Sequence, residues 1–461
     1  MYLDNMGPGK EQCANTEALA PVETNKTELE FPSIQESTMP DEAKLDGIVI
    51  VGAGQAASEA AFSLRQKGYG GRLIMLGDEP YPPYHRPPLS KSYLSGEDDR
   101  QALYLKPAIT YEKLEIEVRT GVRAVQLSVA TNEVTCSDGA TQSYHRLILA
   151  TGGRPRPLVV GATRYESKRL SNLHYLRTID DVDAIRRQLK ANFRLVIIGG
   201  GYIGLEVAAI ARQLHAQVTV LESLPRVLAR VTAPELSEFY EQIHREAGVA
   251  IRTSTQVKSL ELDASGDAIR AVVCADGAVI PADLVIVGIG LVPNVELAEQ
   301  AGLAIDNGIV VDGTGRTSAP QVFAIGDCAS RPSTLYNRRV RLESVPSALE
   351  QARAVAAVLC GQPSPDESPP WFWSNQYDLR LQMVGLSEGY DALVLRGIPS
   401  TRSFIAFYLR DERVIAADAV NSPAAFLFAK RIVARQPVVD NRTALADPTV
   451  PLQTLFAQPH S

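Results

Sequence analysis

Two glycine-rich turns are the residues of this sequence whose types and spacing most directly indicate chemistry. The first, Gly52-Ala53-Gly54-Gln55-Ala56-Ala57, follows an apolar run at 48–51. The second, Gly199-Gly200-Gly201-Tyr202-Ile203-Gly204, follows an apolar run at 195–198. An apolar strand, a glycine turn of this spacing and a following helix commonly bind a dinucleotide pyrophosphate. Two such turns in one chain predict two dinucleotides held face to face, so that electrons pass from one to the other.

Each position of the first turn has a distinct expected role. Gly52 permits the tight turn, Gly54 lets the backbone approach a pyrophosphate, and Ala57 lets the helix pack closely against the strand. The acidic pair Asp78-Glu79 lies near the end of the next strand, a few residues later than is usual for a carboxylate that binds a ribose hydroxyl. A β-α turn with a purely structural role is the alternative interpretation of this unit.

The second turn has all three glycines of the pattern, Gly199, Gly201 and Gly204. Glu222 follows the next apolar run, where a carboxylate accepts hydrogen bonds from the adenosine ribose and repels a 2′-phosphate. No arginine stands directly after Glu222, and Arg226 is the first one beyond it. This unit therefore predicts a preference for NADH over NADPH.

Four further positions carry groups suited to a flavin. Lys91 follows a proline-rich loop, and its ammonium group could stabilise charge on a reduced flavin, although a solvated lysine is the simpler interpretation. Glu206 lies early in the helix after the second turn, where it either sits beside the reacting rings or only favours the helix dipole. Asp327 ends an apolar strand, and its carboxylate suits the ribityl hydroxyls of FAD. Ser344 is expected to cap a helix that begins at Val345 and points its positive end at the flavin.

Composition and charge favour a globular protein whose main partner is neither nucleic acid nor membrane. The 461 residues can fill two or three domains, 45% of them are hydrophobic and the net charge is −7. No apolar run reaches the roughly 18 residues of a membrane span, and no apolar signal segment opens the chain, so a cytoplasmic location is expected. One local basic run is either a solvated face or a patch that steers an acidic partner: Arg338, Arg339, Arg341 and Arg353.

The cysteines argue against two kinds of site. The chain has five, with no C-x-x-C or C-x-x-x-x-C pair and uneven spacing, which indicates neither a disulfide framework nor a redox-active disulfide. A disulfide reductase, which would share both glycine turns, is thereby disfavoured. Cys-His metal spacing is also absent, so we predict no structural metal.

The order of motifs predicts a chain that builds one dinucleotide unit, leaves it, builds a second and returns. Residues 1–45 are polar and without period, which predicts a disordered tail, and Met39 is a candidate for the biological start. Alternating runs at 403–409 and 414–418 predict strands of a small last sheet. The expected units are a first domain at 46–153 and 287–367, an inserted second domain at 154–286, and a C-terminal interface domain at 368–461.

Five motifs, at 87–91, 149–155, 199–206, 287–294 and 324–328, together resemble those of the FAD-dependent ferredoxin reductases of bacterial oxygenase systems. The resemblance extends from about residue 46 to the C-terminus. It implies a glutathione-reductase-like α/β fold, in which two Rossmann-like domains bind FAD and NAD, the NAD domain is inserted in the FAD domain, and a small α+β domain follows. Asn375, Ser347 and His215 depart from the pattern of the family.

The resemblance also implies roles for individual residues. Lys91, Glu206 and Trp373 are expected at the reacting centre, with Trp373 on the side that faces the ferredoxin. Arg353 is expected to dock the iron–sulfur protein. The expected FAD contacts are Gly52, Gly54, Ala57, Asp78, Glu79, Arg86, Lys91, Ala124, Arg177, Asp327 and Val345. The expected NAD contacts are Gly199, Gly201, Ile203, Gly204, Glu222 and Gly290.

The activity that the resemblance implies is oxidation of NADH by a flavoprotein that passes electrons singly to a two-iron two-sulfur ferredoxin, which feeds an oxygenase. The protein is expected to be a monomer or a weak homodimer. Two alternatives remain open. One is a flavin NADH oxidase or peroxidase, which needs a reactive cysteine near the flavin. The other is a redox-sensing flavoprotein similar to the apoptosis-inducing-factor relatives.

Overall fold

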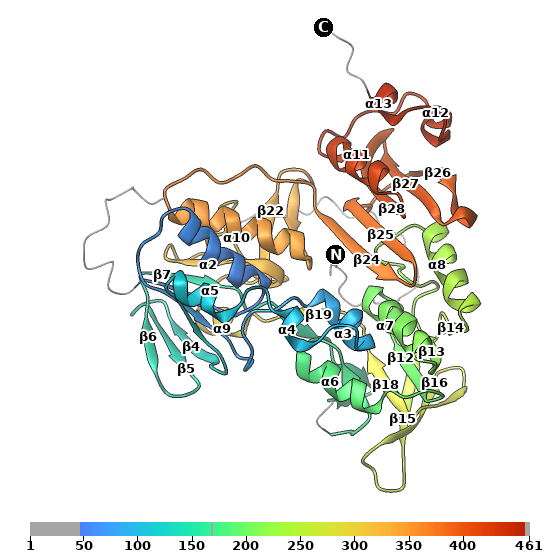
Figure 1. The fold of residues 1–461 in the computed structure, drawn as a ribbon, viewed down its shortest axis with the longest axis horizontal. Helices are drawn as coiled ribbons and strands as arrows, with labels where there is room; N and C mark the ends of the chain where they lie inside the picture. Colours follow the sequence, from blue (N-terminus) through green and yellow to red (C-terminus); the bar gives the residue numbers. More distant parts are fainter. Residues whose placement is uncertain (1–46, 167–168, 457–461) are drawn as a thin grey trace, which may run out of the picture.

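The computed structural model describes residues 47–166 and 169–456. The predicted tail and Met39 lie outside these ranges. The described chain forms two units built on parallel sheets and a third built on an antiparallel sheet (Figure 1). The predicted α/β fold with two Rossmann-like units and a C-terminal domain is confirmed.

The first parallel sheet has the strand order β21-β7-β1-β2-β3. Its central strands are apolar and buried on both faces, as parallel sheets require. Helix α2 and the later helix α10 pack together against it. The bounds are β1 Ile48–Val51, α2 Gln55–Gln66, β2 Leu73–Leu76, β3 Ile116–Arg119, β7 Arg146–Leu149, β21 Val322–Ala324 and α10 Val345–Leu359.

Shorter elements complete this unit. A proline-rich turn and three short helices follow β2, and an antiparallel sheet of β4, β5 and β6 precedes β7. The strands β20, β22 and β23 form a further small sheet. The bounds are η1 Pro87–Ser90, α3 Ser92–Ser95, α4 Arg100–Leu103, α5 Ala108–Lys113, β4 Ala124–Ser128, β5 Glu133–Cys136, β6 Thr141–Ser143, α9 Glu296–Gln300, β20 Ile309–Val310, η2 Gly326–Cys328, β22 Ala329–Ser333 and β23 Arg338–Val340.

The second parallel sheet has the order β11-β18-β12-β13-β14, and a smaller antiparallel sheet of β15, β16 and β17 packs beside it. Helix α6 begins with a capping box in which Thr178 and Asp181 satisfy each other's backbone N–H groups. The bounds are β11 Leu173–Tyr175, α6 Ile179–Gln188, β12 Arg194–Ile198, α7 Tyr202–Gln213, β13 Gln217–Leu221, α8 Pro234–Glu246, β14 Ala250–Arg252, β15 Val257–Leu262, β16 Ile269–Cys274, β17 Val279–Pro281 and β18 Leu284–Val287.

The chain crosses between the two units along a pair of antiparallel strands, β8 (Gly153–Pro155) and β19 (Leu291–Pro293). A Cβ atom at Gly153 would lie 2.0 Å from the Leu291 side chain, so this crossing requires glycine. A separate hairpin of β9 (Leu158–Val160) and β10 (Thr163–Tyr165) follows the first crossing strand.

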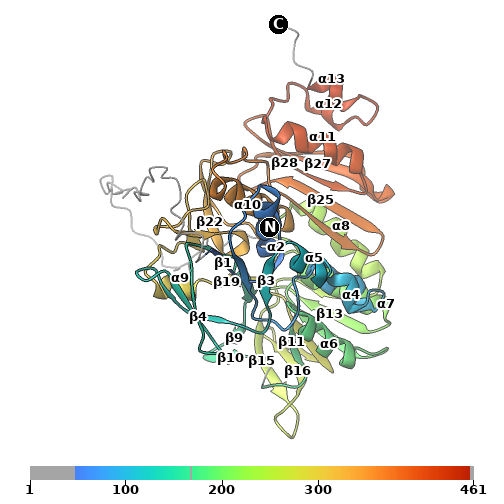
Figure 2. The ribbon, with the colours of Figure 1, turned by 60° about the vertical axis from the view of Figure 1, so that its left-hand side comes forward.

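The last unit is an antiparallel sheet with the order β24-β25-β28-β27-β26. Because side chains alternate along a strand, one face packs under α11 and the other against α8 (Figure 2). The strands predicted at 403–409 and 414–418 are confirmed. The bounds are β24 Trp371–Gln376, β25 Leu379–Gly385, β26 Ala392–Ile398, η3 Pro399–Thr401, β27 Ser403–Arg410, β28 Arg413–Val420, α11 Pro423–Val433, α12 Arg442–Ala446 and α13 Leu452–Leu455.

Within the described ranges, no helix is both long enough and apolar enough to cross a membrane. Over the same residues, His, Cys, Asp and Glu side chains nowhere gather in a group of three that could hold a metal ion.

Candidate functional site

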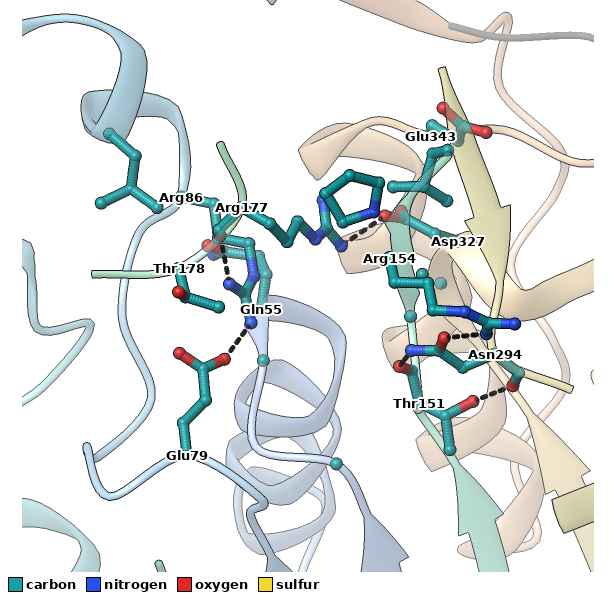
Figure 3. A pocket seen from close by; sticks show the side chains of 18 of the residues that line it. Gln55, Glu79, Arg86, Thr151, Arg154, Arg177, Thr178, Asn294, Asp327 and Glu343 are labelled. Atoms are coloured by element: carbon teal, nitrogen blue, oxygen red, sulfur yellow. Dashed lines mark hydrogen bonds and ion pairs between the residues drawn. The ribbon is translucent and has the colours of Figure 1, made fainter. Parts of the chain in front are cut away.

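A cavity of about 920 Å³ lies where the three units meet, and both glycine-rich turns contribute to its wall. Gly52 and Gly54 line it from the first unit, Ile203 and Gly204 from the second, and Trp373 from the last. Its polar side chains come from several elements and point into one space (Figure 3). A concave site of this size, with a few converging polar groups, is suited to a large organic ligand.

The first glycine turn is shaped for close approach of a ligand. Gly52 has a φ of +116°, and an added Cβ atom would lie 2.2 Å from the Ala150 carbonyl oxygen. Gly54 is different, because an added Cβ atom would meet no protein atom within 4 Å. Gly54 is also the N-cap of α2 and provides no side-chain cap. The free N–H groups of that helix end therefore face space into which a pyrophosphate fits.

Two buried polar atoms in the cavity wall have no protein partner. They are Oε1 of Gln55, at the start of α2, and Nε of Arg177, just after β11. Buried polar atoms normally form hydrogen bonds, so these two orphaned groups indicate a polar ligand. The N-terminus of α10, where Ser344 accepts from the Ser347 N–H over 3.3 Å, opens on the same cavity.

Ion pairs fix the charged side chains around this space. Arg177 Nη2 lies 3.1 Å from Asp327 Oδ2, and Arg86 Nη2 lies 2.6 Å from Glu79 Oε1. Burial lowers the pKa of Arg177, and the Asp327 carboxylate partly offsets this effect. Asp78 is more exposed and pairs with Arg123 at 2.6 Å, at the rim of the cavity.

The charged pair at the centre of the site joins the first unit to the second. Lys91 Nζ lies 2.6 Å from Oε2 of Glu206, although the two residues belong to different units. Glu206 is 1% exposed, and Ser90 Oγ also donates to its Oε2 over 2.5 Å. The position of Glu206 beside the cavity favours the first of the two sequence interpretations, since its carboxylate binds Lys91. Lys91 is likewise no solvated surface lysine.

The second glycine turn approaches the same cavity from its other side. A Cβ atom at Gly204 would lie 2.1 Å from the Gly199 carbonyl oxygen, and one at Gly199 would lie 2.4 Å from that of Gly288. The Glu222 carboxylate accepts from the backbone N–H of Gly200 over 2.7 Å and from that of Leu224 over 2.8 Å. The acidic residue at the end of β13 is thus held beside the glycine turn.

Most of the predicted site residues gather at this cavity. Those that line it are Gly52, Gly54, Asp78, Glu79, Arg86, Lys91, Ala124, Arg177, Ile203, Gly204, Glu206, Gly290, Asp327, Val345 and Trp373. Those outside its lining are Ala57, Gly199, Gly201, Glu222 and Arg353. Ala57 is fully buried inside α2, in agreement with a packing role.

The basic run predicted around Arg338 is not a single exposed patch. Arg341 is 2% exposed, pairs with Glu343 at 2.7 Å and donates to the Asp327 carbonyl oxygen over 3.2 Å. Arg339 donates to the Val311 carbonyl oxygen over 2.6 Å. Arg353 lies on α10 with 57% of its side chain exposed and pairs with Glu59 of α2. The interpretation of these four arginines as one basic surface is therefore wrong. Arg353 lies on a different element, α10.

Several residues at the site had not been identified from the sequence. Ser90 and Ser374 both donate to Glu206, and Gln55 and Glu343 line the cavity. For Ser90 a signal existed, since it stands next to Lys91. Ser374 had none, because its contact with Glu206 joins residues 168 positions apart.

Comparison with known proteins agrees with this site. Residues 46–352 match the pyridine nucleotide-disulphide oxidoreductase family, and residues 371–456 match the reductase C-terminal family. The chain is 50% identical to putidaredoxin reductase of Pseudomonas putida, over 89% of this chain and 97% of that protein.

Two solved structures are similar over the same region. The reductase in the covalent putidaredoxin reductase–putidaredoxin complex has a TM-score of 0.86 and 50% identity, over 89% of this chain and 98% of that one. A ferredoxin reductase from Rhodopseudomonas palustris has a TM-score of 0.84 and 39% identity, over 89% of this chain and 99% of that one. The chain therefore belongs to the pyridine nucleotide-disulphide oxidoreductases, among the FAD-dependent ferredoxin reductases of bacterial oxygenase systems.

Proposed function

We propose that this protein oxidises NADH with a bound FAD and delivers the electrons one at a time to a two-iron two-sulfur ferredoxin that serves an oxygenase. The observation that carries this proposal is the single cavity shared by both glycine turns, with the Lys91–Glu206 pair in its wall. Its relatives include putidaredoxin reductase and the ferredoxin reductase component of an anthranilate dioxygenase system, and their names suggest a ferredoxin as the acceptor.

The residues that would hold FAD are those of the first turn and the ion pairs around it. The N-terminus of α2 would bind the pyrophosphate, and Arg177 and Gln55 would use their unpartnered atoms. Asp327 would accept from ribityl hydroxyls, and the start of α10 at Val345 would provide positive potential. When bound, FAD supplies the redox chemistry, accepting two electrons from NADH and releasing them singly.

The residues that would hold NADH are those of the second turn. Glu222 would accept from the adenosine ribose, and its charge would repel a 2′-phosphate. Arg226, the first arginine after Glu222 in the sequence, is not available to bind a 2′-phosphate. It donates instead to the Thr232 carbonyl oxygen over 2.7 Å and to Ser237 Oγ over 2.6 Å. These bonds hold the guanidinium group toward α8. Proximity of the two rings would then supply much of the acceleration.

The cysteines favour this function over an NADH peroxidase. Cys328 is the cysteine nearest in sequence to Asp327, yet it is fully buried, and burial raises the pKa of its thiol. Cys136 and Cys274 are also buried, and Cys360 is half-buried. None of these four lines the cavity. A reactive thiolate, which a peroxidase needs, is not supported among the described residues.

We further propose that the ferredoxin docks on the surface that includes Trp373 and Arg353. Trp373 lines the cavity, and its ring centroid lies 5.6 Å from that of Trp371. Arg353 is exposed and suits an acidic partner. Arg353→Glu is expected to slow ferredoxin reduction at least tenfold at low salt while reduction of ferricyanide stays within twofold. Equal losses with both acceptors would contradict docking at Arg353.

The proposed function is tested with the purified, FAD-reconstituted protein. Anaerobic NADH should bleach the flavin rapidly, and cytochrome c should be reduced quickly only when a two-iron two-sulfur ferredoxin is added. A protein that binds no flavin would refute the proposal. Slow turnover with a long-lived charge-transfer band, and no ferredoxin reduction, would instead favour the redox-sensing alternative. We propose that the active unit is a monomer or a weak homodimer.

A further inference from the structure

A line of buried hydrogen bonds connects Glu206 to the C-terminal sheet and to α8. Ser374 Oγ donates to Glu206 Oε1 over 2.7 Å, and Gln376 Nε2 donates to Ser374 Oγ over 3.2 Å. Gln376 Oε1 lies 2.9 Å from Nε2 of His244. Glu206, Ser374, Gln376 and His244 are each at most 1% exposed. Polar side chains buried this completely are costly unless their hydrogen bonds are satisfied, so this set calls for a physical explanation.

The alternation of β24 places this line on one face of the strand. Ser374 and Gln376 are two residues apart and buried, whereas Asn375 between them is exposed. The buried face of β24 packs against α7, where Phe372 meets Tyr202 with ring centroids 5.2 Å apart. The strand thus places Ser374 and Gln376 beside the aromatic contact between Phe372 and Tyr202, with Ser374 bonded to Glu206.

The hydrogen bonds have a fixed direction. Gln376 uses its NH₂ group on Ser374, so its carbonyl oxygen accepts from His244, which places the ring proton of His244 on Nε2. Nδ1 of His244 is then an acceptor and faces Tyr377 Oη at 3.3 Å. Every donor in the line therefore points toward the Glu206 carboxylate. Chains of this kind polarise one another and stabilise the charge at their end.

A proton-conducting role does not fit this arrangement. A primary amide such as that of Gln376 is a poor proton relay, because it would have to pass through an unfavourable tautomer. Burial lowers the pKa of His244 to about 4, so its ring is neutral near pH 7, and burial raises the pKa of Tyr377 to about 12. The line is a static set of dipoles rather than a path for protons.

We propose that Ser374, Gln376 and His244 are positioning residues that hold the Glu206 carboxylate aimed at Lys91, so that the C-terminal sheet tunes the charge beside the flavin. Glu206 is then fixed from two sides. Ser90 and Lys91 occupy Oε2, and Ser374 occupies Oε1. The inference rests on the proposed function, because it assigns the pair an effect on a bound flavin.

The test is a redox titration of the flavin in the holoprotein with Ser374→Ala. Loss of the donor frees Glu206 Oε1, so the carboxylate is held less firmly against Lys91. The Lys91 charge is then less compensated, and the flavin becomes easier to reduce. The NADH/NAD⁺ ratio for half reduction is expected to fall about tenfold, or about 30 mV for a two-electron couple. Gln376→Leu should shift the ratio in the same direction by less, and Ser374→Thr, which keeps a hydroxyl, should restore the wild-type value.

The chain offers a matched control. Ser333 is 4% exposed and donates to the Glu367 carboxylate over 2.5 Å, outside the cavity lining. Ser333→Ala removes the same kind of bond and should leave the ratio unchanged. A double variant adds a second check, because Ser374→Ala should have no further effect on the ratio in a Glu206→Gln background.

The outcomes separate this inference from the proposed function. A wild-type protein that binds no FAD, or whose flavin NADH does not reduce, would refute the proposed function itself. A wild-type protein that titrates normally, with Ser374→Ala and Gln376→Leu indistinguishable from it and from Ser333→Ala, would overturn the positioning role alone. A full shift by Ser374→Ala in the Glu206→Gln background would also overturn it, since the effect would not pass through Glu206.

Discussion

Asp418→Asn is expected to change how the stability of the protein depends on pH. Asp418 lies in β28 and is 4% exposed, at the contact between the C-terminal sheet and the start of α8. Its carboxylate accepts from Tyr408 Oη over 2.6 Å and from Thr232 Oγ1 over 2.8 Å. Burial raises the pKa of Asp418 to about 6, and these two hydrogen bonds offset only part of that effect. The carboxyl of Asp418 therefore binds its proton more tightly in the folded protein than in the unfolded chain.

The sign and size of the effect follow from linkage between protonation and folding. An acid whose pKa is higher in the folded than in the unfolded state contributes stability below its unfolded pKa, and this is lost as pH rises through the folded pKa. A rise from 3.8 to about 6 corresponds to about 3 kcal/mol in total. Between pH 5 and pH 8 the unfolding free energy should lose about 1.4 kcal/mol of this contribution.

The assay is urea unfolding of the wild type and of Asp418→Asn at pH 5 and pH 8. Asparagine does not titrate, so the stability of the wild type relative to the variant should fall by about 1.4 kcal/mol between these values. The control is Asp411→Asn, which makes the same change at an exposed aspartate in the turn of the same hairpin. A constant difference for Asp418→Asn would show that burial does not control this carboxyl.

Three further variants probe the two nucleotide sites. Asp327→Ala leaves Arg177 unpaired and should weaken FAD binding roughly 30-fold, for about 2 kcal/mol; a variant that keeps full FAD content after gel filtration contradicts this. Gly204→Ala places a Cβ atom 2.1 Å from the Gly199 carbonyl oxygen and should raise the KM for NADH while FAD stays bound; an unchanged KM would refute the tight packing. Glu222→Ala with Ser223→Arg should lower the ratio of kcat/KM for NADH to that for NADPH at least tenfold; an unchanged ratio would argue against a ribose role for Glu222.

The parts of the fold that follow from local sequence were predictable. The apolar runs before each glycine turn become β1 and β12, and the apolar run before Glu222 becomes β13. Such runs are predictable because a strand buried on both faces must be continuously apolar. The glycines that face the cavity from these turns were predictable for a different reason. Their spacing fixes which backbone atoms approach a ligand.

Contacts between distant segments were not predictable in this way. Lys91 and Glu206 had each been associated with the flavin, but nothing in the sequence indicates that they form an ion pair across 115 positions. The sequence suggests that Arg341 belongs to a basic surface. In the fold its charge is buried, and the ion pair with Glu343 compensates that charge. Periodicity describes one element at a time, whereas these pairs depend on how elements from different units meet.

Glu206 is the residue on which the three units converge. Its side chain receives donors from the loop after η1, through Lys91, and from β24, through Ser374, while its own backbone belongs to α7. A buried carboxylate with these donors is stable only when all of the segments are in place, because removing one leaves a charge partly desolvated and unpaired. The site that would face the flavin is therefore coupled to assembly of the C-terminal sheet on the second unit. A change at Trp373, where we propose that the ferredoxin docks, can reach the Lys91–Glu206 pair through Ser374, the next residue on β24.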